Sequence, residues 1–83
     1  MPRYYFPATD GRRNVADDGG LLLASPEAAR REARAIASEL LTAEDEHSAQ
    51  AWRGWRILVL DDAGDLISEV SLTDVAQAMP AHA

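Results

Sequence analysis

The chain has 83 residues and a mass of 9.0 kDa, and its eight Arg against fourteen acidic residues give a net charge of −6. A chain this short hides only about 60–65% of the surface that it exposes when unfolded. These values exclude a second domain and a large enzyme pocket, and the lack of Cys excludes disulfides, thiolate zinc sites and a thiol nucleophile.

The large apolar residues are few. The hydrophobic fraction is 47%, but 16 of these residues are Ala, which leaves 23 larger side chains to build a core. This content lies near the level at which charged chains tend toward disorder. We therefore expect a single small domain over residues 1–83, with a frayed tail at 79–83, whose thin core favours association with a partner.

The net negative charge of the chain comes entirely from its second half. Residues 1–40 carry six Arg and six acidic residues, whereas residues 41–83 hold the whole −6. The pI of about 4.6 argues against nucleic-acid binding by the chain as a whole. The N-terminus does not resemble a signal peptide, and no apolar run approaches the ~20 residues of a membrane span. We expect a cytoplasmic protein that does not enter a membrane.

The first predicted element is an extended segment over residues 3–9. The alternation of a strand places Tyr4 and Phe6 on one face and Tyr5 on the other. Because Pro7 has no N–H to donate, we expect an edge strand or one that loses its pairing at the end.

A short extended run at residues 21–23 precedes the one predicted main helix, over residues ~26–42. Ser25 can accept a hydrogen bond from a free backbone N–H, and Pro26 occupies the first position, where its missing donor costs nothing. Apolar residues then form one helical stripe: Ala29, Ala33, Ile36, Ala37, Leu40 and Leu41. Since the first half of the stripe is Ala, the helix can lie close against a sheet.

The last third of the chain predicts a β-hairpin, with strands at 55–60 and 66–72 around an acidic turn. Counting outward from the turn places Val59 opposite Ile67 and Leu60 opposite Leu66. Both hairpin faces are then apolar: Ile57, Val59 and Ile67 on one, and Leu58, Leu60, Leu66, Val70 and Leu72 on the other. A sheet with one solvated face alternates instead. We expect the helix to cover one face and either residues 73–79 or another chain to cover the second.

The chain begins with a Pro-Arg-Tyr-Tyr-Phe motif at residues 2–6, and in this it resembles a family of short bacterial proteins of unknown function. The likeness rests on this motif, on Asp18-x-Gly20, on the helical segment 29–33 and on residues 55–64, and it spans most of residues 2–72. The resemblance implies the fold outline and a bacterial origin, and it carries no catalytic or binding residues to transfer.

Candidate catalytic and metal-binding residues are few. The acidic segment 61–65 fits a turn better than an EF-hand calcium loop, because the third and twelfth positions of such a loop would be Ala63 and Leu72. His47 and His82 are the only imidazoles, and the serines lack a Gly-flanked nucleophile elbow. We therefore predict that the protein is not an enzyme and has no cofactor or metal.

These elements predict a two-layer α+β domain, in which one main helix crosses a three- or four-stranded, mostly antiparallel sheet. The second apolar face and the aromatic residues favour a non-catalytic interaction module, a homodimer or a complex with a protein partner. The candidate interface residues are Tyr5, Trp52, Trp55, Ile57, Val59 and Ile67.

A small regulatory nucleic-acid-binding protein is the alternative. It would contact phosphates through Arg30, Arg31 and Arg34 on the outer face of the helix. The equal number of acidic residues in this half of the chain, and the helical spacing of Glu27 to Arg30 and Arg31, favour an ordinary solvated helix face.

Overall fold

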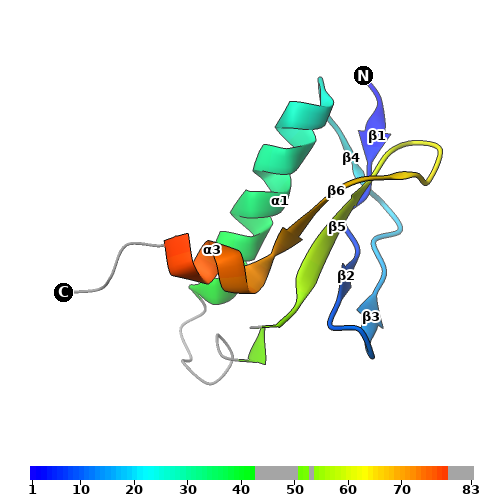
Figure 1. The fold of residues 1–83 in the computed structure, drawn as a ribbon. Helices are drawn as coiled ribbons and strands as arrows, with labels where there is room; N and C mark the ends of the chain where they lie inside the picture. The colour runs from blue at the N-terminus through cyan, green and yellow to red at the C-terminus, as the bar shows by residue number, and fades with distance from the viewer. Residues whose placement is uncertain (43–50, 53, 79–83) are drawn as a thin grey trace.

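The computed structural model describes residues 1–42, 51–52 and 54–78. Its elements in chain order are β1 (Arg3–Tyr4), β2 (Ala8–Thr9), β3 (Asn14–Val15), β4 (Leu21–Leu22), α1 (Pro26–Leu41), β5 (Arg56–Leu60), β6 (Leu66–Ser71) and α3 (Leu72–Ala78). Helix α1 runs along one face of the strands, and α3 lies near its C-terminal end (Figure 1).

The strands form two antiparallel sheets. One sheet pairs β1 with β4, and the other has the order β3-β2-β5-β6. The α+β class, the four-stranded antiparallel sheet and the single main helix are confirmed.

The N-terminal segment divides its pairing between the two sheets. Tyr5 lies between β1 and β2 and exchanges two backbone hydrogen bonds with Leu60, at 3.0 and 2.9 Å. Pro7 continues this run by accepting from the N–H of Leu58 at 2.8 Å, a role that needs no donor. Strand β2 pairs with β5 after it, so the expected edge position or loss of pairing is wrong for this part of the segment. The segment therefore crosses from the edge of the small sheet into the interior of the large one. Strand β3, which pairs with β2 after the turn, was not predicted.

The predicted cap and apolar stripe of α1 are confirmed. Ser25 has an extended backbone, and its Oγ accepts a hydrogen bond from the N–H of Ala28 at 3.1 Å. The alanines of the stripe are fully buried, and its larger residues pack against the core from the flanks. Small side chains on the central line of the helix allow its backbone to approach the sheet closely.

The core lies between α1 and the strands. Tyr4 and Phe6 contribute from the N-terminal segment, and Ile57 and Val59 are 1% and 0% exposed on β5. The full set of buried apolar residues is Tyr4, Phe6, Ala29, Ala33, Ala37, Ile57, Val59, Val70 and Leu72.

A β-bulge corrects the predicted register of the hairpin. Leu60 does pair with Leu66, but Val59 pairs with Ser68, so Ile67 is the extra residue between the two pairs. The extra residue exchanges the faces of the strand beyond it. Val70, which was predicted on the second face, therefore lies inside, opposite Ile57.

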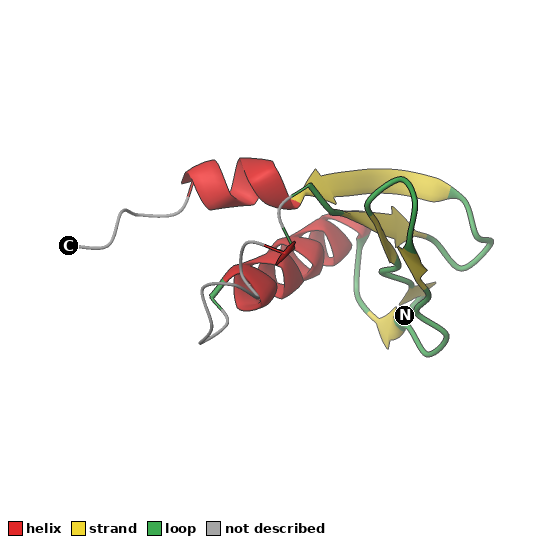
Figure 2. Ribbon diagram, turned by 90° about the horizontal axis from the view of Figure 1, so that it is seen from below, coloured by secondary structure: helices red, strands yellow, loops and turns green. Residues whose placement is uncertain are grey.

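Leu72 was predicted to end a strand, and residues 73–79 were one of two possible covers for the second sheet face; the structure shows neither for residues 72–78. Leu72 is fully buried and begins α3, which continues directly from the end of β6 (Figure 2). Helix α3 contacts α1 and β6, and Val75 packs against the core. The segment thus extends the helical layer instead of crossing the sheet. The predicted frayed tail lies outside the described residues.

Candidate interaction surface

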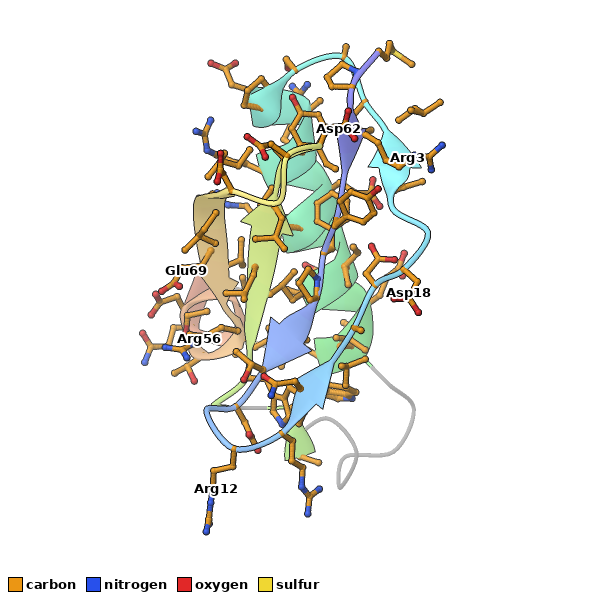
Figure 3. The ribbon with its side chains drawn as sticks, turned by 90° about the vertical axis from the view of Figure 1, so that its right-hand side faces the viewer. Arg3, Arg12, Asp18, Arg56, Asp62 and Glu69 are labelled. Atoms are coloured by element: carbon orange, nitrogen blue, oxygen red, sulfur yellow. The ribbon has the colours of Figure 1, made fainter. Side chains whose placement is uncertain are left out.

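The face of the four-stranded sheet that is turned away from α1 carries apolar side chains, and no described helix or strand covers it. We call this surface the open face, and its apolar members are Tyr5, Leu58, Leu60 and Leu66. Figure 3 looks onto it, with α1 behind the strands. The first three side chains are half-buried and Leu66 is 57% exposed, and none of the four packs against the core cluster.

Strand geometry explains how these residues come to share one face. Tyr5 lies between Tyr4 and Phe6, which point into the core, and it pairs with Leu60 on β5. Leu58 and Leu60 alternate with the buried residues of the same strand. Leu66 joins them because it pairs with Leu60 before the bulge.

Two opposite charges border the apolar part of the open face. Arg56 begins β5, and Glu69 pairs with Leu58 from β6, so that both side chains belong to this face. Both are exposed, and they project side by side at the same border of the sheet (Figure 3). The surface therefore combines an apolar centre with one positive and one negative group.

Two of the predicted interface residues belong to the core. Ile57 and Val59 lie beneath α1, so they cannot contact a partner while the domain is folded. Ile67 is half-buried at the bulge and packs against the core. Only Tyr5 among the predicted residues lies on the open face. The interface prediction used the wrong hairpin face for β5, because it did not determine which face receives the helix.

The sequence did contain a signal for the correct face. Arg56 is the only charged residue of β5, and it alternates with Leu58 and Leu60, whereas the other alternation is wholly apolar. A charged residue on one alternation marks the side that stays open to solvent. Arg56 and Glu69 are functional candidates that the sequence reading missed.

Trp52 and Trp55 form a separate aromatic feature before β5. Their ring centroids are 5.0 Å apart at an interplanar angle of 64°, an edge-to-face arrangement. Both are half-buried and pack against the core. With Arg13 and Ala51 they line a pocket of about 280 Å³. They contribute to the core and to this pocket, and they stand apart from the apolar residues of the open face.

The arginines of the alternative hypothesis lie on the solvent side of α1. Arg30, Arg31 and Arg34 are all exposed, as that hypothesis requires. Glu27, also exposed, precedes them in the first turn of the helix. The structure thus presents these three residues on the exposed side of one helix.

The acidic segment 61–65 of the hairpin forms a turn, as predicted. Asp61 Oδ1 accepts from the N–H groups of Ala63 and Asp65, both at 2.9 Å, and Gly64 adopts a φ of 86°. These bonds satisfy the backbone of the turn. Across the described residues, no group of three His, Cys, Asp or Glu side chains is placed to hold a metal ion. His47 and His82 lie outside the described part of the chain.

A second acidic turn, between β2 and β3, carries a perturbed carboxyl group. The pKa of Asp10 lies below its ordinary value of 3.8, because the backbone N–H of Arg13 and then that of Arg12 stabilise the carboxylate. Both donate to Oδ1, at 2.6 and 2.8 Å. Arg12 and Arg13 are exposed beyond this turn. Asp10 stabilises the turn, and these backbone hydrogen bonds account for its lowered pKa without a bound ligand.

None of the helices in the described ranges is long and apolar enough to cross a membrane.

Comparisons with known proteins assign the family. No curated protein and no solved structure matches the chain. One family model, described as a domain of unknown function, DUF6894, matches residues 3–73. This range contains the N-terminal segment, α1 and the whole hairpin, so the chain belongs to the DUF6894 family, for which no function is described.

Proposed function

We propose that this protein is a non-catalytic interaction module that associates with a second copy of itself by stacking the open faces of two sheets. The observation that carries the proposal is the apolar centre of the open face, formed by Tyr5, Leu58, Leu60 and Leu66 outside the core cluster. Aromatic and aliphatic side chains gathered on one uncovered surface favour protein–protein contact.

The charges at the border of the open face favour a second copy as the partner. Consider a two-fold axis that lies midway between the two stacked sheets, parallel to the strands and over the gap between β5 and β6. It would lay β5 of each copy over β6 of the other. Arg56 of each copy would then come within reach of Glu69 of the other, and Leu60 would stack on Leu66. One surface therefore supplies both halves of a complementary contact, in the aligned packing that β-sandwiches use.

The non-catalytic part of the proposal rests on side chains that already have structural roles. The Ser25 hydroxyl caps α1, and Asp61 and Asp10 accept backbone hydrogen bonds in turns. The chain has no Cys, and its two His residues are far apart in the sequence. Absence of Cys also fits a cytoplasmic setting, and the family resemblance implies a bacterial origin; we include both in the proposal.

The test is the oligomeric state measured by analytical ultracentrifugation between about 1 and 300 μM. We expect a reversible monomer–dimer equilibrium in this range. Leu66→Lys should shift it to monomer, because the lysine ammonium would have to be desolvated at the centre of the interface. Val15→Lys is the matched control, since Val15 is 50% exposed on β3 and the change in net charge is the same.

Charge reversal separates this arrangement from nonspecific association. Arg56→Glu and Glu69→Arg should each weaken the dimer, and the double variant should restore it. A protein that stays monomeric at the highest concentration would overturn the proposal. So would a dimer that tolerates Leu66→Lys as well as Val15→Lys.

Exposure of all three α1 arginines is the observation that favours the alternative, nucleic-acid binding. Titration of a single-stranded RNA and a duplex DNA at low salt tests it, because phosphate contacts weaken steeply as salt rises. Binding that Arg30→Glu and Arg34→Glu abolish would support the alternative. The net charge of −6 predicts no such binding.

A further inference from the structure

We propose that the free edge of β6, with the groove beside it, binds an extended basic peptide as an additional strand of the sheet. This binding goes beyond the proposed self-association, because it uses the backbone edge of β6 and the surface between the helices, and it shares only Glu69 with the open face. Strand β6 is the last of the order β3-β2-β5-β6, and no described strand pairs with its outer side.

The hydrogen-bond pattern shows which backbone groups of β6 are available. The N–H of Leu72 donates to the carbonyl oxygen of Trp55 at 3.0 Å, and the register continues through the pair Val70–Ile57. These residues direct their backbone groups toward β5. Since alternate residues of a strand direct theirs to opposite sides, Glu69 and Ser71 present their N–H and C=O groups at the free edge. An added strand can bond to them.

A groove of about 470 Å³ runs along this edge. It is lined by Glu69, Val70 and Ser71 of β6, which are consecutive although their side chains alternate between faces. Because three consecutive residues line it, the groove follows the edge of β6 and does not lie on one face of the sheet. Helix α1 contributes Arg34 and Ser38 to its walls, and α3 contributes Asp74, Val75 and Ala78.

The groove has features that suit a peptide strand. Val70 and Val75 offer apolar contact, and the backbone edge offers hydrogen bonds that do not depend on the peptide's sequence. Six residues of β6 make a longer edge than the two residues of β3 at the opposite side of the sheet. The edge also retains no proline, a residue that natural proteins use to block added strands.

The charges of the groove select a basic peptide. Glu69 and Asp74 are two exposed acids against the single cation Arg34, on a chain whose net charge is −6. A lysine or arginine of the added strand opposite Glu69 would form a favourable cross-strand pair. Long-range attraction would also speed its encounter with this protein.

The same charge disfavours a second copy of β6 at this edge. Suppose that the β6 strands of two copies pair edge to edge, antiparallel, through their free backbone groups. In the register centred on Glu69, the two Glu69 carboxylates then lie directly opposite each other. Like charges in that position destabilise a sheet. We therefore assign the edge to a basic peptide from a different protein and the open face to the second copy.

The probe is a blocked eight-residue peptide that alternates Val or Thr with Lys, titrated into ¹⁵N-labelled protein at a concentration where the protein is monomeric. We expect amide shifts centred on β6 and α3, with slower hydrogen exchange at the N–H groups of Glu69 and Ser71. The same peptide N-methylated on the residues that face β6 keeps its charge but loses its N–H donors and carries methyl groups that block close approach to the edge, and it should not bind. A peptide with Glu in place of Lys should bind at least tenfold more weakly.

Variants of the groove supply a second readout. Asp74→Asn should weaken the Lys peptide about threefold or more, whereas Asp62→Asn changes the charge equally at the distant hairpin turn and should leave affinity unchanged. Arg34→Ala should tighten binding, because it removes the cation that opposes the peptide.

Three results would overturn the inference. They are shifts confined to other surfaces, equal binding of the N-methylated peptide, and protection of Glu69 and Ser71 that appears without peptide and rises with protein concentration. The last result would assign the edge to self-association. None of these results depends on self-association, because Leu66→Lys should abolish dimers and leave peptide binding intact.

Discussion

The carboxylate of Asp17 accepts a hydrogen bond from the backbone N–H of Phe6, with 3.0 Å between Oδ2 and the nitrogen. Tyr5, the preceding residue, directs its backbone groups to Leu60 on β5, so the N–H of Phe6 points to the other side of the segment. Asp17 satisfies it there, and Oδ1 of the same side chain accepts from the N–H of Gly20 at 3.2 Å. One side chain thus fastens the connection between β3 and β4 to the N-terminal segment.

Asp17→Ala should lower the free energy of unfolding by about 1–3 kcal/mol, because it leaves the partly buried Phe6 N–H without this acceptor. Chemical denaturation followed by circular dichroism measures the change. Asp18→Ala is the matched control, since Asp18 is exposed beside it, and its effect should stay within about 0.5 kcal/mol. Equal effects of the two variants would contradict the role given to Asp17.

Gly20→Ala should destabilise the fold by about 2 kcal/mol or more, from left-handed backbone strain and from steric overlap. Gly20 has a φ of 64°, and an added Cβ would lie 2.6 Å from the carbonyl oxygen of Tyr4 and 2.9 Å from Cγ of Arg3. The control is Gly19→Ala, because a Cβ at Gly19 meets nothing within 4 Å. Thermal melting of the two variants should differ by several degrees; a coincident pair of melts would refute this account of Gly20.

Ala33→Leu should cost about 1–3 kcal/mol, because Ala33 is fully buried where α1 lies against the sheet and a larger side chain forces the two layers apart. Ala35, two residues along the same helix, is exposed, so Ala35→Leu should leave stability almost unchanged. Urea unfolding of both variants makes the comparison. A stable Ala33→Leu variant would mean that the helix does not pack through its alanines.

Because of the bulge at Ile67, truncating two apolar residues of β6 should lower the free energy of unfolding by unequal amounts. Val70→Ala should lower stability by about 1–2 kcal/mol, because Val70 is 8% exposed in the core. Leu66→Ala removes a larger side chain but should cost under about 0.5 kcal/mol, since Leu66 is 57% exposed. The regular register predicted from sequence places both on one face, so similar costs would support that register against the bulge.

Asp10 predicts an acid-dependent loss of stability in the β2–β3 turn. Its pKa is lower in the folded chain than the ordinary 3.8, so its contribution is fully present above that value. The contribution falls as pH drops through the lower, folded pKa. The melting-temperature difference between the wild type and Asp10→Asn should therefore shrink between pH ~5 and ~2. A difference that stays constant with pH would show that the carboxylate charge does not support the turn.

The local features of this protein follow from short stretches of its sequence. Ser25, Pro26 and the alanine stripe specify α1 because a cap and a helical period act within a few residues. Asp61 and Gly64 specify the hairpin turn for the same reason. The alternation of Tyr4, Tyr5 and Phe6 assigned two rings to the core and one to the surface, and the family likeness of residues 2–72 agrees with the matched range 3–73.

Which hairpin face is open depends on how the helix packs against the whole sheet. One extra residue at Ile67 exchanged the faces of β6, which moved Val70 and Leu72 into the core and left Glu69 beside Arg56. A bulge is set by competition between whole faces for the helix, so no short segment encodes it. Because Leu72 is buried in the resulting core, the chain turns into α3 beside α1, and residues 73–78 leave the open face uncovered.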